Sequence, residues 1–457
     1  MRDSQSVLDR VDAEGDEYLE QLKDYLRIPS ISTDPAYDDE VVRCCDFVLD
    51  RMREAGLECE RIETDHHPLA YGEWMGAPGK PTVLFYGHYD VQPPDPLELW
   101  RHPPFEPVVE GDLLVARGAT DDKGQSFTHI KAVHALLSER GELPVNVKFL
   151  VEGEEESGGE SIEAYVRADA ANRLACDCVV VSDTAMYAPG QPSLLYGLKG
   201  LVYMELKVTG PRRDLHSGTF GGAVANPANA LAQIIAGLRD AQTGRVLIPG
   251  FYDDVRPLTE EERASFAALP FDEQAWADEI GIPAPFGEEG YSTQERIWAR
   301  PTCDVNGIFG GYQGQGAKTV LPSWAGAKVS MRMVPDQDPA TIAAQFRAHV
   351  EAIVPPGVTV EVDYVHGTPA VLINTDGEFF EAAMAAQEDV WGKRPVLVRE
   401  GGSIPIVGTF KEVLQVPVML IGFGLSDDRL HSPNEKFNIS HYFNGIKTVV
   451  RLLDRLG

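Results

Sequence analysis

Basic residues and cysteines are scarce in this 457-residue chain, and long apolar runs are missing. Only 40 Lys and Arg stand against 71 Asp and Glu, so the formal net charge is −31. Such a surface repels phosphate backbones and anionic lipid and attracts cations. No stretch reaches the roughly 20 consecutive apolar residues that span a bilayer. We therefore expect no nucleic-acid partner and no membrane partner.

The six cysteines form no CxxC pair and no disulfide-dense pattern, and the first residues lack a basic segment followed by an apolar one. We expect reduced thiols and a cytoplasmic protein. Hydrophobic residues (43%) and charged residues (24%) are near the average of globular domains, which excludes collagen-like and disordered classes. A chain of this length is too long for one ordinary core and predicts several domains.

Short apolar runs alternate with helical patterns in the outer parts of the sequence. The predicted strands are 82–86, 113–116, 145–151, 179–181 and 416–421. The helical patterns between and after them include 41–55, 127–137, 378–390 and 442–456. This alternation predicts an α/β domain with a mostly parallel sheet.

The middle of the sequence has a different pattern of apolar residues. Alternating strands at 202–208, 327–333 and 358–364 accompany a helical stretch at 226–238. We predict an outer domain formed by 1–196 and 373–457 that is interrupted by an inserted α+β domain at 197–372. Inside the insert, the acidic, proline-containing passage 249–294 is expected to be an irregular, solvated excursion.

Imidazoles and carboxylates follow the predicted strands of the outer domain. They are His88, Asp90, Asp121, Glu155, Glu156, Asp183 and His431. In open α/β sheets the ligand crevice lies at the carboxyl ends of the strands, so these side chains are expected to converge there. That many carboxylates repel one another unless cations lie among them, and nitrogen and oxygen ligands suit zinc, manganese or cobalt.

Each of these residues alone has an ordinary explanation, since a single His or Asp after a strand is more often a hydrogen-bonded loop residue. The joint pattern favours a metal site. Asp90 stands two residues after His88, a spacing that can point both side chains to one side and let the carboxylate orient the imidazole. In the Glu155–Glu156 pair, one carboxylate can bind a metal while the other carries a proton.

A set of motifs in a fixed order resembles one enzyme family. The motifs are GHYDVQP, RGATDDKGQ, EGEEESGG, VSDT, DLHSGTFGG, GAKTVLP, REGGSIP and DDRLHSPNE. They resemble the co-catalytic zinc exopeptidase family that contains carnosine dipeptidases and other cytosolic dipeptidases, carboxypeptidase G, aminoacylase and acetylornithine deacetylase. The resemblance covers most of the chain and is closest to the dipeptidase branch, because DLHSGTFGG and GGSIP are more specific than the shared metal motifs.

The resemblance implies two divalent metal ions per subunit, zinc in the first place and manganese or cobalt as alternatives. Asp121 matches the carboxylate that bridges the two ions. His88 and Asp183 match the remaining ligands of one ion, and Glu156 and His431 match those of the other.

The same resemblance assigns roles around the metals. Glu155 matches the general base and Asp90 the residue that orients His88, while Glu154 is the alternative base because three glutamates stand in a row. In the family the peptide bond after the bridging aspartate tends to be cis, which here is Asp121–Asp122.

The insert is expected to act as a lid and as the surface of a homodimer, with residues 218–238 at the dimer contact. By resemblance, His216 stabilises the oxyanion of the substrate, in its own subunit or in the neighbouring one. Arg332 grips the substrate carboxylate, and Thr319 and Ser403 help to hold the same end of the substrate.

The implied activity is that of a metal-dependent dipeptidase. It would hydrolyse the amide bond of short peptides with a free C-terminal carboxylate, through a metal-bridging water and a glutamate base. The alternative is an N-acyl amino acid deacylase with the same metal centre. A more distant alternative is a non-catalytic metal-binding dimer.

Overall fold

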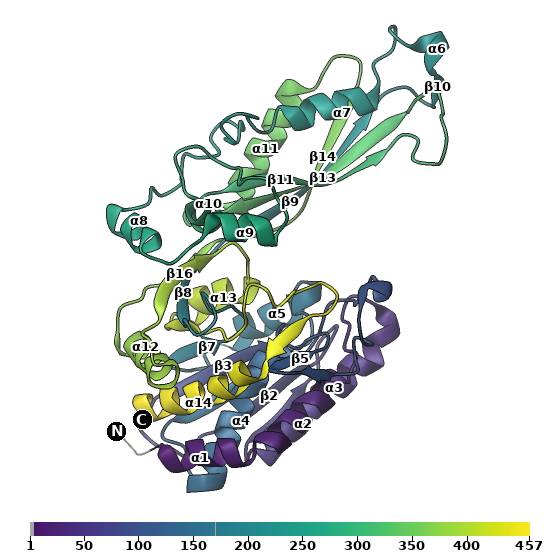
Figure 1. Cartoon of the computed structure of the whole chain (residues 1–457). Helices are drawn as coiled ribbons and strands as arrows, with labels where there is room; N and C mark the ends of the chain where they lie inside the picture. The colour runs from purple at the N-terminus through teal and green to yellow at the C-terminus, as the bar shows by residue number, and fades with distance from the viewer. Residues whose placement is uncertain (1–3, 170) are drawn as a thin grey trace. The chain divides into compact units, whose positions relative to one another are not determined.

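The two ends of the chain build one unit and the middle of the chain builds a second unit (Figure 1). The computed structural model describes residues 4–169 and 171–457. Unit 1 contains the chain up to Tyr196, Ile373–Val398 and Pro405–Gly457, and unit 2 contains Gly197–Leu372 and Arg399–Ile404. The sequence placed residues 399–404 with the outer domain; main-chain hydrogen bonding between Lys199 and Gly402 (3.0 Å) attaches them to unit 2 instead.

The main sheet has nine strands, in the order β1-β2-β6-β3-β7-β17-β8-β15, and β16 also pairs with β8. The strands are β1 (Glu58–Ile62), β2 (Leu69–Trp74), β3 (Thr82–His88), β6 (Asn146–Glu152), β7 (Cys178–Val181), β8 (Ser193–Leu198), β15 (Val371–Leu372), β16 (Val396–Glu400) and β17 (Val418–Leu420). The four central strands β6, β3, β7 and β17 are parallel and wholly buried, which explains their continuous apolar runs. The predicted α/β class is confirmed, with antiparallel strands on both sides of the parallel centre.

One predicted strand of this sheet lies elsewhere. The run 113–116 forms β5 (Leu113–Val115), which pairs with β4 (Val108–Glu110) and β18 (Lys436–Asn438) in a separate three-stranded sheet. A turn through Gly111, whose φ is +67°, folds β4 back on β5, and β18 arrives from the far end of the chain. The sequence could not show this last pairing because its partners lie more than 300 residues apart.

Helices cover the main sheet in unit 1. They are α1 (Gln5–Ala13), α2 (Gly15–Leu26), α3 (Asp38–Glu54), α4 (Lys123–Arg140), α5 (Glu160–Asp169), α12 (Glu378–Trp391), α13 (Pro405–Thr409), which continues as the π-helix η4 (Phe410–Leu414), and α14 (Ile439–Leu456). Single 3₁₀ turns are η1 (Pro35–Tyr37), η2 (Leu97–Leu99) and η3 (Glu155–Ser157). Helix α4 is buried on almost all sides because it contacts β3, α1, α2, α3 and α14. It therefore fixes the loop at its N-terminus, which begins the metal-binding region described below.

Unit 2 is built on a four-stranded antiparallel sheet in the order β11-β13-β9-β14. Its strands are β9 (Gly200–Thr209), β11 (Thr302–Gly310), β13 (Trp324–Met333) and β14 (Thr359–Thr368). Helices α7 (Pro227–Ala236) and α11 (Pro339–Ile353) contact this sheet, and the alternate residues Val202, Met204, Leu206 and Val208 of β9 are buried. A small pair, β10 (Leu215–His216) with β12 (Val320–Leu321), leads into α6 (Ser217–Phe220).

The passage 249–294 is more ordered than the sequence interpretation expected. It contains α8 (Glu260–Ala267) and α9 (Glu273–Glu279) and leads into α10 (Thr293–Ala299). Helices α8 and α10 begin with capping boxes, in which a Ser or Thr and a Glu three residues later each bind the other's main chain. The local polarity that suggested a solvated loop is partly the polarity of these helix starts.

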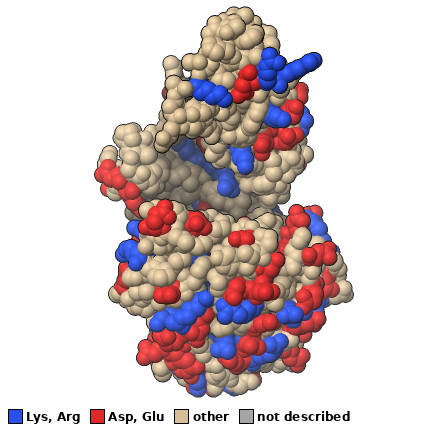
Figure 2. Space-filling model, turned by 90° about the vertical axis from the view of Figure 1, so that its right-hand side faces the viewer, with Lys and Arg blue, Asp and Glu red and all other residues tan. Residues whose placement is uncertain are grey.

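The distribution of charged side chains on the surface and the polarity of the helices are consistent with the acidic, low-hydropathy composition. Figure 2 shows Asp and Glu side chains spread over the visible face of unit 1 with Lys and Arg between them. Within the part of the chain that the structure describes, no helix is both long and apolar enough to span a bilayer.

Candidate metal centre

The five predicted ligands come from five separate segments of unit 1. His88 is the last residue of β3, Asp121 lies just before α4, and Glu156 lies in η3 directly after β6. Asp183 follows β7, and His431 lies in the loop between β17 and β18. Because β3, β6, β7 and β17 are parallel, their carboxyl ends meet at one edge of the sheet.

At this edge the structure forms two ligand groups that share Asp121. His88, Asp121 and Asp183 form one group, and Asp121, Glu156 and His431 form the other, with the ligand atoms of each group within 4.8 Å of one another. His88 Nε2 lies 3.1 Å from Asp121 Oδ1 and 3.9 Å from Asp183 Oδ2. His431 Nε2 lies 2.9 Å from Asp121 Oδ2 and 3.4 Å from Glu156 Oε2. The two oxygens of one carboxylate thus face two different groups.

The electrostatics of these groups fit a pair of cations. Burial opposes the charge of Asp121, but hydrogen bonds with His431 and His88 hold the pKa of this carboxyl well below its usual range. Hydrogen bonds to Asp121 and Glu156 raise the pKa of His431 to about 10. Burial raises the pKa of Glu156. Two divalent cations would take over the compensation that protons on the imidazoles provide, and the nitrogen and oxygen donors suit such ions.

Asp90 connects the two groups. His88 Nδ1 lies 3.1 Å from the main-chain oxygen of Asp90 and 3.3 Å from its carboxylate Oδ1, so both oxygens can orient the imidazole. The other carboxylate oxygen accepts hydrogen bonds from Ser32 Oγ (2.6 Å) and from the main-chain N–H of Glu156 (3.1 Å). Sequence reasoning found Asp90 but missed Ser32, which stands in no motif.

The structure separates the roles of the adjacent glutamates. Glu154 is buried and accepts hydrogen bonds from the main-chain N–H of His67 (2.7 Å) and from Ser161 Oγ (2.7 Å) and N–H (3.1 Å). It therefore anchors the start of α5. Glu155 has no such bond among the described residues, and burial raises its pKa well above the usual range. This contrast favours Glu155 as the base.

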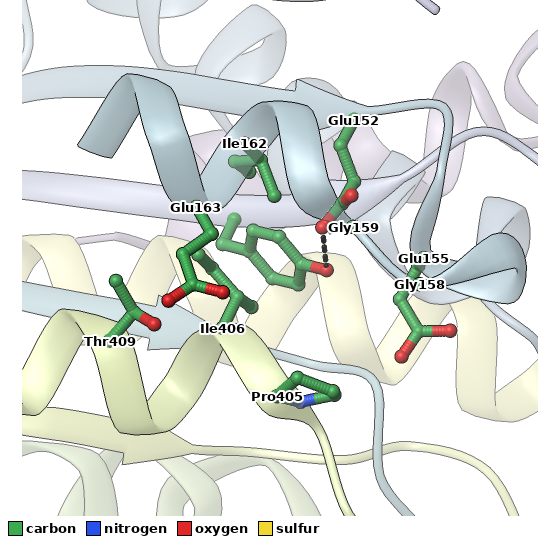
Figure 3. A pocket seen from close by; sticks show the side chains of 10 residues that line it. Glu152, Glu155, Gly158, Gly159, Ile162, Glu163, Pro405, Ile406 and Thr409 are labelled. Atoms are coloured by element: carbon green, nitrogen blue, oxygen red, sulfur yellow. Dashed lines mark hydrogen bonds between the residues drawn. The ribbon is translucent and has the colours of Figure 1, made fainter. Parts of the chain in front are cut away.

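Glu155 also borders a small cavity of about 20 Å³, which is room for one water molecule (Figure 3). Tyr86 OH donates a hydrogen bond of 2.7 Å to Glu152 Oε1 on another side of this cavity. The second carboxylate oxygen of Glu152 is buried without a hydrogen-bond partner, and burial raises the pKa of Glu152 to about 8. The cavity is further lined by Gly158, Gly159, Ile162, Glu163, Pro405, Ile406 and Thr409.

Glu435 holds the loop that carries Asp121, a role that sequence reasoning missed. Its buried carboxylate accepts hydrogen bonds from Arg117 Nη1 (2.7 Å) and from the main-chain N–H groups of Gly118 (2.9 Å), Thr120 (3.0 Å) and Asp121 (3.1 Å). Glu435 stands four residues after His431 in the DDRLHSPNE motif, so the only available signal was its place in that motif. It joins the loops of both groups.

Two further details surround the ligands. Gln92 Nε2 donates a hydrogen bond of 2.7 Å to Glu156 Oε2, and the main-chain N–H of His88 donates to Asp122 Oδ2 (3.2 Å). The Asp121–Asp122 peptide bond is cis, as expected.

The predicted residues of unit 2 form two pairs. Arg332 Nη1 donates a hydrogen bond of 3.0 Å to Ser403 Oγ. His216 is exposed, its Nδ1 accepts a hydrogen bond from Gly218 N–H (3.0 Å), and Thr319 directly precedes its strand partner Val320.

These two pairs do not meet within the unit. Arg332 lies near the end of β13, whereas β12 precedes the beginning of β13 at Trp324 and pairs there with β10, which Figure 1 labels. Trp324 and Arg332 are eight positions apart in an extended strand, a span of about 25 Å.

A parallel-centred α/β unit with two ligand groups around one shared aspartate is the architecture of a dinuclear metal-dependent hydrolase. The family model "Peptidase family M20/M25/M40" matches residues 84–455, and the chain belongs to this family of metallopeptidases. The predicted family resemblance is thereby confirmed.

Individual relatives cover nearly the whole chain. Cys-Gly metallodipeptidase dug1 of Schizosaccharomyces pombe is 34% identical over 96% of this chain and 95% of its own length. Beta-Ala-His dipeptidase of Homo sapiens is 31% identical over 97% of this chain and 90% of its own length. The solved structure of the dipeptidase Dug1p from Saccharomyces cerevisiae superposes with a TM-score of 0.89 at 31% identity, over 99% of this chain and 98% of that chain.

Proposed function

We propose that this metallopeptidase hydrolyses dipeptides with a free C-terminal carboxylate. The observation that carries the proposal is Asp121, whose two carboxylate oxygens face two separate ligand groups. Relatives named as dipeptidases over nearly the full chain support the same substrate class. His88 and Asp183 would hold one divalent ion, and Glu156 and His431 the other, with zinc first and manganese or cobalt as alternatives.

The reaction divides among a few groups of the chain. Bound divalent cations supply Lewis acidity, which activates water and polarises the scissile carbonyl. Glu155 accepts a proton from the attacking water while the water oxygen bonds to the carbonyl carbon. Glu155 then returns the proton to the amide nitrogen as the C–N bond breaks, so the amine leaves neutral. Asp90 keeps His88 in orientation throughout.

Arg332 and Ser403 would hold the free carboxylate of the substrate. A guanidinium presents two parallel donors that match a carboxylate, and Ser403 Oγ fixes one Nη atom of Arg332 at 3.0 Å. This arrangement selects peptides by their C-terminus and restricts the enzyme to short substrates.

The insert supports a homodimer with a shared site. A dipeptide is only about 7 Å long, whereas the pair His216–Thr319 and the pair Arg332–Ser403 lie at opposite ends of β13 in one chain. One copy of unit 2 therefore cannot bring both pairs to the same dipeptide. In the dimer, through residues 218–238, His216 of the partner subunit would stabilise the oxyanion. All six cysteines are free thiols, which supports a cytoplasmic location.

A substrate panel tests this function. Metal-stripped protein is reconstituted with zinc, manganese or cobalt and assayed on an unprotected dipeptide, its N-acetyl analogue and its C-terminal amide. We expect turnover only after reconstitution and highest kcat/KM on the unprotected dipeptide. Faster hydrolysis of the N-acetyl substrate would establish the deacylase alternative, and metal uptake without any turnover would establish the non-catalytic one.

A further inference from the structure

Lys199 is a buried lysine beside the Arg332–Ser403 pair, in the short link between β8 and β9. Its side chain is only 3% exposed. The ammonium Nζ donates a hydrogen bond of 3.0 Å to the main-chain oxygen of Arg296 in α10. No carboxylate lies within ion-pair distance of Lys199 or of Arg332 among the residues that the structure describes.

The main chain of Lys199 is part of the same network. Its N–H donates to the main-chain oxygen of Gly402 (3.0 Å), and its carbonyl accepts a short hydrogen bond from Ser403 Oγ. Ser403 Oγ in turn accepts the bond from Arg332 Nη1. Lys199 therefore fixes the position of the hydroxyl group that fixes Arg332.

The charges around Lys199 leave a positive excess. Besides Arg332, charges that act on Lys199 include Arg300, which binds Glu288 at 2.7 Å, and Asp304, which lies 3.4 Å from Arg239. Both neighbouring carboxylates thus have their own partners. Burial and Arg332 together lower the pKa of Lys199 to about 7, and burial lowers the pKa of Arg332.

A buried lysine and a half-buried arginine side by side without a carboxylate partner are costly, and in a chain with a net charge of −31 a compensating carboxylate would be easy to supply. The absence of such a carboxylate indicates that the compensating anion is supplied by a bound ligand. We propose that Lys199 is a positioning residue of the carboxylate site: its main chain places Ser403, and its ammonium adds positive potential behind Arg332 for the substrate carboxylate. This inference rests on the proposed function and adds a residue to it.

The variant Lys199→Met tests the charge, because methionine keeps most of the aliphatic length of lysine without the ammonium. We expect KM for the free-carboxylate dipeptide to rise about tenfold, with kcat and the kinetics on the amidated dipeptide nearly unchanged. The melting temperature should stay equal or rise, since an unpaired buried charge is removed. A merely structural lysine predicts the opposite pattern, with a lower melting temperature and equal losses on both substrates.

Two further variants make the test specific. Lys199→Gln keeps a donor for the Arg296 oxygen but lacks the charge, so it should show the same rise in KM; wild-type KM in this variant would overturn the proposal. Lys328→Met removes an exposed charge from β13 of the same unit and should leave KM unchanged. An equal rise in KM for Lys328→Met would show that the effect of Lys199→Met comes only from the change in the net charge of the protein. That result would also overturn the proposal.

Calorimetry with glycine and glycinamide on the metal-loaded protein separates this inference from the function. Glycine should bind more tightly than glycinamide, and Lys199→Met should remove the difference. If the wild type hydrolyses no dipeptide but still binds glycine more tightly than glycinamide, the proposed function is wrong and the carboxylate-binding role of Lys199 is retained. If the wild type is active and Lys199→Met keeps the preference for glycine, the role of Lys199 fails alone.

Discussion

At the scale of single residues, the metal centre depends on two features. Each carboxylate oxygen of Asp121 faces a different ligand group, and the adjacent residues Glu154 and Glu155 have different contacts. Glu155 and Glu154 are neighbours in sequence, yet one borders the small cavity and the other anchors α5. Substitutions at the two positions should therefore fail in different ways.

We expect Glu155→Ala to bind both metal ions and to lose activity by at least about 100-fold, because proton transfer is removed while the ligands remain. The matched variant Glu154→Ala should lose roughly 1–3 kcal/mol of stability, because the donors of His67 and Ser161 lose their buried acceptor. Turnover, elemental analysis and urea unfolding on both variants check this. Wild-type turnover of Glu155→Ala with a strongly impaired Glu154→Ala would reverse the assignment.

His431 predicts how metal uptake depends on pH. Its pKa in the metal-free protein is raised to about 10, above the ordinary value near 6.5, so the imidazole is protonated at pH 8 and must lose its proton to bind a metal. Protons should therefore be released when zinc is added at pH 8, and affinity should fall as the pH is lowered. His431→Asn should release fewer protons. Zinc titrations in weakly buffered indicator solution measure the release; binding without release would contradict the prediction.

The same shift affects the metal-free fold. Because the folded pKa of His431 lies above the unfolded one, its contribution to stability is complete below about pH 6.5 and is lost as the pH rises through about 10.

The sequence predicted the residues that stand in local motifs and missed those that act over a distance. His88, Asp90 and Asp121 follow strands in recognisable patterns, and the structure brings them together. Ser32 and the role of Glu435 were missed, because their partners are carboxylates and main-chain N–H groups that only the folded chain brings near.

At the scale of elements, the sequence predicted the strands that are buried on both faces, but it did not predict the pairing of the short edge strands. The central strands β3, β6 and β7 carry continuous apolar runs, so their type and order along the chain were predictable. β5 has three residues and pairs with β18 from the end of the chain, which no local pattern shows. The helices α8 and α10 were missed although their capping boxes were visible in the sequence.

The hydrogen bonds of Glu435 to the loop that carries Asp121 give a prediction at this scale. Glu435→Gln leaves the buried Arg117 without its counter-charge and weakens the hold on the Asp121 loop. We expect a loss of roughly 3 kcal/mol in the free energy of unfolding and weaker zinc binding. Asp427→Asn, an exposed change in the same loop, should stay within about 0.5 kcal/mol. Unchanged zinc affinity in Glu435→Gln would show that these hydrogen bonds do not position the ligands.

At the scale of the whole molecule, the opposite ends of β13 predict a functional dimer. Light scattering after size exclusion should give twice the mass of one chain. Co-expressed His216→Ala and Glu155→Ala chains should recover about a quarter of wild-type activity, because half of the dimers are mixed and each mixed dimer has one complete site. Each variant alone should be nearly inactive. No recovery in verified mixed dimers would place His216 in its own subunit's site.

The separation of Asp121 from His431 has a consequence for biosynthesis. These residues are 310 positions apart, and the whole of Gly197–Leu372 is made between them. While the ribosome is still producing that middle portion, the second ligand group lacks its histidine. The second group can therefore take up its cation only when translation is nearly finished, and incomplete chains released before that point should emerge without a complete pair of ligand groups.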